Sequence, residues 1–522
     1  MMDMTTKSFA SEAAPTFTGN RALQIEEPLI FEIGTGETCG VDLEEPEAVE
    51  SRLGDMARAE PIGLPGLSEP EAVRHYVRLS QNNYSIDTGI FPLGSCTMKH
   101  NPRLNEKMAR LPGFGDIHPL QPQRTVEGAV RAMAELSDWL ITLTGMPAVA
   151  LSPKAGAHGE LCGMIAIKAA LDARGQAATR RVVLVPDSAH GTNPATAALL
   201  GFQVHPVAAA KDGTVRVEAV REALGDGHDV AAMMLTNPNT CGLFEPEITQ
   251  IAAALHEAGG YLYCDGANFN AIAGKVRPGD LGVDAMHINL HKTFSTPHGG
   301  GGPGAGPVVF SAALAPFAPL PLLRLEGDAW TLVEDAPATG EGAGQGARPF
   351  GRLVAFHGQM GMFVRALTYM LSFGADGIRQ ASEDAVLNAN YIRALLRDVM
   401  SQPFGDRPCM HEVLFDESFL KGTGLTTLDF AKAMIDEGFH PMTVYFPLVV
   451  HGAMLIEPTE SESKHSLDQF IAALRGLALA AREGETERFK GAPRFAPRRR
   501  LDETRAARQP VLRYRRKGGA TA

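Results

Sequence analysis

Lys292 is the residue whose type and setting most strongly suggest covalent chemistry. It follows the apolar segment 284–289, lies between His291 and Thr293, and precedes a run rich in glycine. A lysine at a strand end that is partly buried loses some of its charge and can form a Schiff base. Asp265 follows a second apolar segment and could pair with the protonated nitrogen of pyridoxal phosphate. Taken alone, the two residues could equally be a surface lysine and an aspartate that caps a turn.

The segment 154–159, Lys-Ala-Gly-Ala-His-Gly, is a candidate phosphate site. Small residues that open a helix expose backbone N–H groups and the positive end of the helix dipole to an anion. Gly156 and Ala157 would lie against the phosphate, and His158 could stack on the cofactor ring. A plain helix start is the alternative. The run Gly299–Gly306 lacks the features of a P-loop and of a dinucleotide fold, so neither ATP nor NAD is supported.

Further candidates lie in turns after predicted strands, where ligands bind in open α/β sheets. Asn237 could hydrogen-bond the phenolic oxygen of the cofactor, or it could instead shape the turn before Pro238. His291, next to the lysine, is another candidate cofactor contact. Candidate substrate or channel residues come from two turn-rich segments: Ser95, Thr97, His190 and Thr192. The cysteines and histidines lack the spacing of a zinc site, so no metal is expected.

The elements that must position these residues are short apolar strands that alternate with helices. Strands are predicted at 181–185, 229–235, 261–264, 284–289 and 307–310. Helices are predicted at 126–144, 160–174 and 246–258. This order is typical of an α/β fold with a mostly parallel, doubly wound sheet. Further along the chain, helices at 352–372 and 379–399 and strands near 411–415 and 442–450 indicate a smaller α+β domain.

These patterns divide the chain into four predicted parts, with a Gly/Pro/Ala-rich connector at 336–350. They are an N-terminal arm and loop segment at 1–120, a large cofactor-binding α/β domain at 121–345, a small C-terminal α+β domain at 346–486 and a basic tail at 487–522.

Composition supports a globular protein, because 44% of the 522 residues are hydrophobic and 21% are charged. The net charge of −12 disfavours nucleic-acid binding by the whole chain. The tail from residue 487 has 12 basic and 3 acidic residues, and a solvated or intersubunit segment is favoured there. The start of the sequence has no secretory pattern, and no apolar run approaches the ~18 residues of a membrane span. We therefore expect a soluble, cytoplasmic protein.

Several long strings together resemble the P-protein family of the glycine cleavage system, glycine dehydrogenase (decarboxylating), in its subunit 2 form. They are DTGIFPLGSCTMKHNP (87–102), AGAHGE (155–160), VPDSAHGTNPA (185–195), LTNPNTCGLFE (235–245), DGANFNAI (265–272), NLHKTFSTPHGGGGPGAGP (289–307), EDAVLNANY (383–391), IEPTESES (456–463) and LDETRAARQPVLRY (501–514). The resemblance covers the chain from about residue 60 to its end.

The resemblance implies fold type I of the pyridoxal-phosphate enzymes. It makes Lys292 the Schiff-base lysine and Asp265 the partner of the pyridine nitrogen. Ala267 would pack against one face of the cofactor ring, and His158 would stack on the ring. The implied activity is decarboxylation of glycine, with transfer of the aminomethyl group to the lipoyl arm of the H-protein.

The same resemblance implies a partner chain. The sequence matches only the lysine-bearing half of the long single-chain form, so subunit 1 and a heterotetramer with two copies of each subunit are expected. Neither nucleic acid nor membrane is an expected partner. The alternatives are another fold-type-I activity, such as an aminotransferase or a desulfurase, a catalytically silent scaffold subunit, and a nucleic-acid contact through the basic tail.

Overall fold

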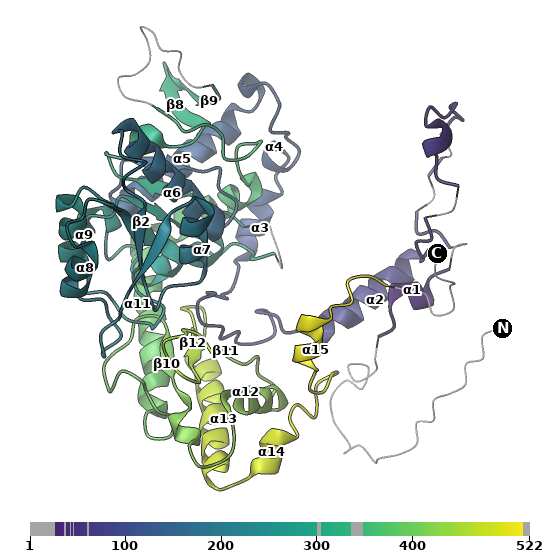
Figure 1. Ribbon diagram of the computed structural model, residues 1–522. Helices are drawn as coiled ribbons and strands as arrows, with labels where there is room; N and C mark the ends of the chain where they lie inside the picture. The colour runs from purple at the N-terminus through teal and green to yellow at the C-terminus, as the bar shows by residue number, and fades with distance from the viewer. Residues whose placement is uncertain are drawn as a thin grey trace. The chain divides into compact units, whose positions relative to one another are not determined.

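The computed structural model describes residues 27–35, 38–41, 43–44, 46–59, 62–299, 304–335 and 348–514. The chain divides into two compact units (Figure 1). One contains Met1–Ser85 and Gly491–Ala522, and the other is Ile86–Lys490. The predicted boundaries at 120/121, 345/346 and 486/487 stay a prediction, and most of the connector at 336–350 lies outside the described residues.

The first unit joins the N-terminal arm to the basic tail. Its α-helices are α1 (Ile30–Ile33), α2 (Glu69–Gln81) and α15 (Glu503–Arg508). Helix α2 begins with a capping box formed by Ser68 and Glu71. The Phe31 ring stacks on Tyr514, with 4.7 Å between ring centroids. This stacking places residues from both ends of the sequence in one structural unit.

A seven-stranded sheet forms the centre of the second unit, in the order β1-β7-β6-β5-β4-β2-β3. Its strands are β1 (Ala148–Ala150), β2 (Val182–Pro186), β3 (Gln203–Val207), β4 (Val230–Thr236), β5 (Tyr261–Asp265), β6 (Ala285–His287) and β7 (Val308–Phe310). Strands β2 to β6 pair in parallel, and β7 runs antiparallel to both β6 and β1. The predicted mostly parallel α/β sheet is therefore confirmed.

Helices cover both faces of this sheet. They are α5 (Glu127–Thr144), α6 (Gly156–Ala173), α7 (Thr192–Leu199), α8 (Val217–Leu224) and α9 (Ile248–Glu257). Neighbouring residues of β4 show that both faces of the sheet are apolar. Met233 packs in one apolar core with α5, α8 and α9. Its neighbour Met234 packs in the other core, with α6 and α7. Successive strand side chains point to opposite faces, so a strand buried on both faces reads as the continuous apolar run seen in the sequence.

Close packing of α6 on β6 depends on Gly159. A Cβ atom there would lie 2.6 Å from the His287 Cβ and 2.7 Å from the Gly306 carbonyl oxygen. We expect Gly159→Ala to lower the free energy of unfolding by about 1–3 kcal/mol, because helix and strand must separate. The matched control is Gly128→Ala in α5, where a Cβ meets no atom within 4 Å. Thermal unfolding that gives both variants the same midpoint would contradict this packing.

The remainder of the second unit contains the long helix α11 and a small antiparallel sheet. Helix α11 (Met360–Leu396) replaces the two predicted helices and is broken at Gly374, whose φ of 62° is left-handed. The small sheet has the order β10-β12-β11. Its strands are β10 (Val413–Phe415), β11 (Thr443–Val444) and β12 (Met454–Ile456). Helix α12 (Thr427–Asp436) packs on β11, and α13 (Lys464–Arg482) and α14 (Thr486–Lys490) pack on α12. Strand β12 was not predicted, and β11 is shorter than expected.

Three smaller elements complete this unit. They are the helices α3 (Arg103–Ala109) and α4 (Pro112–Gly115) and the hairpin of β8 (Leu322–Glu326) and β9 (Ala329–Val333). Within the described part of the chain, none of the helices has both the length and the apolar character needed to cross a membrane.

Candidate active site

A cavity of about 260 Å³ opens where the carboxyl ends of β4, β5 and β6 meet the first turn of α6. Most of the predicted site residues line it: Ser95, Gly156, Ala157, His190, Thr192, Asp265, Ala267, His291 and Lys292. The sheet topology brings them together, because parallel strands present their carboxyl ends at one edge.

Lys292 reaches this cavity from α10 (Leu290–Thr293), a single helical turn after β6. Its Nζ donates a hydrogen bond to the Ser95 carbonyl oxygen at 2.8 Å. Ser95 lies almost two hundred residues earlier, in the turn-rich segment that was predicted to form part of the channel. The lysine amine is therefore held at the cavity wall by the backbone of a distant loop.

Asp265, the last residue of β5, lies beside Lys292 in a network of buried polar groups. Its carboxylate accepts hydrogen bonds from the Ala267 backbone N–H at 2.9 Å and from the Asn193 amide at 3.3 Å. The Nε2 atom of His287 lies 3.4 Å away, and Nδ1 of that ring is 2.6 Å from the Tyr263 hydroxyl. Burial disfavours the charged carboxylate, but His287, these donors and Lys292 outweigh it and keep the pKa of Asp265 below its ordinary value. The wall of the cavity thus contains a buried, ionised carboxylate.

Glu160 is a second carboxyl in the same wall, and it is only 1% exposed. It accepts a hydrogen bond from the Asn193 amide, which it shares with Asp265. Burial, together with the negative charge of Asp265, raises the pKa of Glu160 to about 8. Glu160 therefore carries a proton near neutral pH, and Asp265 carries the charge.

The raised pKa of Glu160 predicts a loss of stability as the pH rises from 4.5 to about 8. Between its ordinary pKa of 4.5 and about 8, the folded chain binds a proton that the unfolded chain releases. The free energy of unfolding therefore falls as the pH rises, by a few kcal/mol in all. Glu160→Gln, which keeps the acceptor for Asn193, is expected to shrink the drop in thermal midpoint between about pH 6 and about pH 8.5. Glu218→Gln on the exposed face of α8 is the control, and an equal drop in all three proteins would contradict the assignment.

The first turn of α6 has the features of an anion site. Its N-cap residue, Ala155, makes no side-chain hydrogen bond to the turn. A Cβ on Gly156 would lie 2.7 Å from the Asn289 amide nitrogen, so the backbone passes close to the cavity floor. Buried polar atoms around the cavity have no partner among the described residues: Thr236 Oγ1, Asn268 Oδ1, Asn289 Oδ1, His291 Nδ1 and His298 Nε2. An uncapped helix start and unpaired polar atoms fit a phosphorylated, polar ring.

Comparison with known proteins decides the family. A "Probable glycine dehydrogenase (decarboxylating) subunit 2" from Caulobacter vibrioides is 67% identical over 97% of this chain and 95% of its own length. The chain belongs to the glycine dehydrogenase (decarboxylating) subunit 2 family. A member from Listeria innocua is 48% identical over 93% of this chain and 98% of its own length.

Two family profiles agree with this membership. The one described as "Glycine dehydrogenase, C-terminal domain" matches residues 381–492, and "Aminotransferase class-V" matches residues 162–302. Among solved structures, the inhibitor-bound glycine decarboxylase (P-protein) of the glycine cleavage system has a TM-score of 0.67 at 20% identity. That match covers 82% of this chain and 93% of the other. The predicted fold and the predicted cofactor, pyridoxal 5′-phosphate, are confirmed, and the subunit 2 name implies a partner subunit.

Three predicted residues of this subunit 2 chain do not line the cavity. The half-buried His158 accepts a hydrogen bond from the Lys154 backbone at 3.2 Å, so its ring belongs to the turn that opens α6. The Asn237 side chain accepts one from the Glu245 backbone at 3.0 Å. Thr97 is turned toward the small sheet. The roles assigned to these three residues stay predictions.

Sequence reasoning missed several cavity residues: Cys96, Glu160, Thr236, Thr240, Asn268, His287, Asn289 and His298. A signal existed for some of them, because Glu160 and Asn289 lie within the strings that resemble the family. His287 lies inside a short apolar strand, and such a histidine is ordinarily read as part of the core. Only the pairing of β5 with β6 shows that it lies beside Asp265.

Proposed function

We propose that this chain is the cofactor-bearing subunit of a glycine decarboxylase that passes the aminomethyl group to the lipoyl arm of the H-protein. The observation that carries the proposal is one cavity lined by Lys292, Asp265 and the uncapped first turn of α6. The family membership supplies the reaction.

When bound, pyridoxal 5′-phosphate supplies an electron sink for the electron pair that the departing carboxylate leaves behind. Lys292 provides the amine that attaches the cofactor, and the Ser95 carbonyl orients that amine. Asp265 would accept a hydrogen bond from the ring nitrogen and keep it protonated, because its own pKa is lowered. Glu160, protonated, adds no second negative charge to the wall.

Other residues bind and orient the substrate and the cofactor. The N–H groups of Gly156 and Ala157 would bind the phosphate, and the small Ala267 would leave room for one face of the ring. His190 lines the cavity and would contact the substrate or the phosphate, while stacking of His158 on the ring stays a prediction. Ser95, Thr192 and His291 contact the substrate or the phosphate from the same wall.

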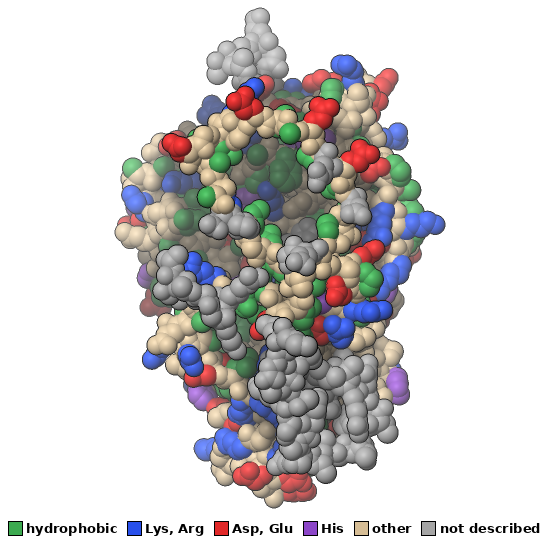
Figure 2. Space-filling view, turned by 90° about the vertical axis from the view of Figure 1, so that its right-hand side faces the viewer, with side chains coloured by type: hydrophobic (Ala, Val, Ile, Leu, Met, Phe, Trp, Pro, Cys, Tyr) green, Lys and Arg blue, Asp and Glu red, His purple; other side chains and the backbone are tan. Residues whose placement is uncertain are grey.

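The partner that we propose is subunit 1, in a heterotetramer with two copies of each chain, acting in the cytoplasm. Support comes from the subunit 2 names of the relatives, which the chain matches over nearly their whole length. The nucleic-acid alternative concerns the basic tail at 487–522 and stays a prediction. The face in Figure 2 carries both basic and acidic side chains.

The test is exchange of labelled bicarbonate into the carboxyl group of glycine. We expect exchange from the chain co-expressed with subunit 1 and supplied with lipoylated H-protein, and its loss when any one of the three is omitted. Exchange that does not need the lipoyl carrier would instead support a simple decarboxylase. Transamination of glycine in its place would support the aminotransferase alternative.

A further inference from the structure

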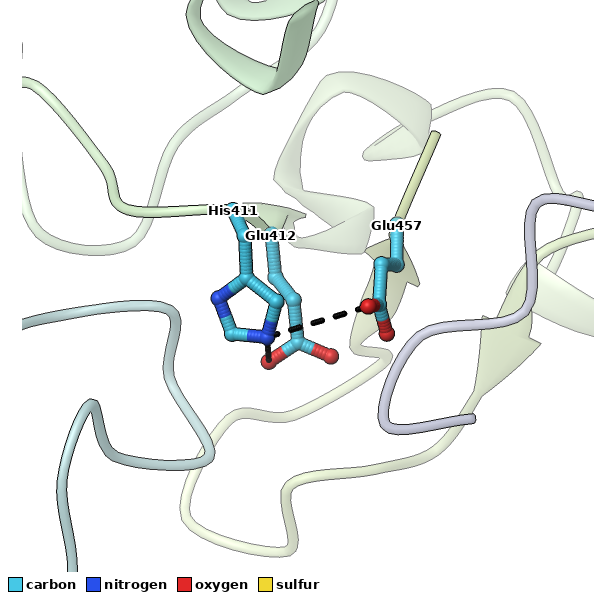
Figure 3. Close-up of side chains that lie close together, drawn as sticks. All are labelled: His411, Glu412 and Glu457. Carbon is cyan, nitrogen blue, oxygen red and sulfur yellow. Dashed lines mark ion pairs between the residues drawn. The ribbon is translucent and has the colours of Figure 1, made fainter. Parts of the chain in front are cut away.

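A cluster of three ionisable side chains lies outside the cavity, in the small sheet. His411 and Glu412 directly precede β10, and Glu457 directly follows the antiparallel strand β12. All three side chains are completely buried. The Nε2 atom of His411 points between the two carboxyls and lies 3.8 Å from an oxygen of each (Figure 3).

The two carboxyls of this cluster have different surroundings. Glu457 accepts hydrogen bonds from the Thr97 backbone N–H at 3.0 Å, the Thr97 hydroxyl at 2.5 Å and the Asn270 amide at 3.1 Å. This set of donors stabilises an ionised carboxylate. Glu412 accepts a hydrogen bond on Oε1 from the Ser95 backbone N–H, while its Oε2 has no partner within the described ranges.

A second buried negative charge beside Glu457 would be costly, because two neighbouring carboxylates do not both ionise readily in a dry site. Burial, followed by the charge of Glu457, raises the pKa of Glu412 well above its ordinary value. The Oε2 atom of Glu412 accepts no hydrogen bond within the described ranges, and a carboxyl oxygen of Glu412 lies within 4.8 Å of an oxygen of Glu457. Oε2 is therefore the atom left to carry a proton in this cluster. Burial also lowers the pKa of His411, which therefore stays neutral.

Apart from the Asn270 amide, the groups that donate to these carboxyls belong to a strained turn, Ser95–Thr97. Ser95 has a φ of 66° and Thr97 a φ of 45°, both in the left-handed region, which a β-branched residue such as threonine rarely enters. Such a backbone persists only where its surroundings hold it. The carbonyl oxygen of the same Ser95 accepts the hydrogen bond from Lys292 Nζ. The turn therefore connects the carboxyl cluster to the reactive lysine.

We propose that Glu412 and Glu457 form one carboxyl pair that shares a single proton and positions Lys292 by holding the turn Ser95–Thr97. Both are positioning residues, since neither lines the cavity. The inference rests on the proposed function only for the role of Lys292.

A histidine with two carboxylates is also a possible set of metal ligands, but the contacts favour a proton. Both oxygens of Glu457 are already occupied by N–H and O–H donors. The Nδ1 atom of His411 has no partner in the described part of the chain, whereas a metal-bound histidine almost always donates from its other nitrogen. The positive charge of Lys292 also acts on Glu412. The metal content of the wild-type complex is therefore measured as part of the test.

The test compares Glu412→Gln with Glu457→Gln, each in the complex with the partner subunit. The amide of the first variant reproduces a protonated carboxyl, accepting from Ser95 and donating to Glu457. We expect its kcat to stay within about 3-fold of wild type. The amide of the second variant turns an NH₂ group toward the donors of Thr97 and Asn270. We expect kcat to fall by about 50-fold or more with little change in KM for glycine, because Lys292 is misplaced.

Readouts other than activity are the absorbance band of the bound cofactor and its retention during dialysis. Both should change in Glu457→Gln and stay as in wild type in Glu412→Gln. Thr97→Val, which keeps the shape of the turn and removes one donor, should change them in the same direction. It serves as a second variant should Glu457→Gln fail to fold.

Equal behaviour of the two glutamine variants in a cofactor-loaded complex would overturn this inference alone. So would one equivalent of metal in the wild-type complex that both variants lose. A wild-type complex that binds no pyridoxal phosphate would contradict the proposed function and this inference together.

Discussion

Lys292→Ala is expected to remove the cofactor's absorbance band above ~400 nm and to lower the rate of bicarbonate exchange by at least about 10³-fold. Among the described residues that line the cavity, Lys292 supplies the one side-chain amine. Without that amine the aldehyde of the cofactor has no covalent partner in the wall. The measurement is an absorbance spectrum and an exchange rate for the variant co-expressed with subunit 1.

The matched control for this variant is Lys275→Ala. Lys275 is exposed and pairs with Glu383 at 2.6 Å, outside the cavity. The Lys275→Ala variant should keep both the absorbance band and the exchange rate of wild type. A Lys292→Ala protein that retains the band would show that another lysine holds the cofactor.

Asp265→Asn is expected to have the second largest effect. The substitution keeps the size of the side chain and an acceptor for the Ala267 N–H but removes the negative charge that we propose keeps the ring nitrogen protonated. We expect exchange to fall by about 10³-fold, equivalent to about 4 kcal/mol of transition-state stabilisation. The absorbance band should remain, although shifted, because Lys292 is intact.

The combination of a retained band and lost exchange distinguishes Asp265→Asn from Lys292→Ala. Asn193→Ala is a weaker companion, since it leaves the Ala267 hydrogen bond to Asp265 in place. It removes the longer hydrogen bond to the same carboxylate, at 3.3 Å, together with the one from Asn193 to Glu160. Its rate should lie between wild type and Asp265→Asn. An Asp265→Asn complex that keeps more than about a tenth of the wild-type rate would contradict the role of this carboxylate.

The sequence predicts the central strands and the amphipathic helices of this fold well, for a physical reason. Strand β4 is buried along its whole length. Each of its residues therefore needs an apolar or small side chain, and the strand appears in the sequence as a continuous apolar run. Strand β3 escapes prediction because it lies at the sheet edge, is exposed at four of its five residues and contains Pro206. Helix α11 reads as two helices because Gly374 interrupts the pattern, although the chain continues in one element.

The candidate site is predictable where chemistry gathers in short strings at strand ends, as at Lys292, Asp265 and Gly156. It is not predictable where a role depends on packing between distant segments. The link from Glu457 through Thr97 and Ser95 to Lys292 joins three regions that are far apart in the sequence. In the sequence Glu457 reads as an ordinary residue, and Ser95 and Thr97 are candidates for the channel only, so the contact between the turn and the small sheet is not predicted.

The most direct test of the central claim, that this cavity holds the cofactor on Lys292, is reduction of the wild-type complex with hydride. The covalent link is fixed by the reduction, and the modified peptide is then located by mass spectrometry after proteolysis. We expect a phosphopyridoxyl group on the peptide that contains Lys292. The same group on a different lysine, or a complex with no modified lysine, would contradict it.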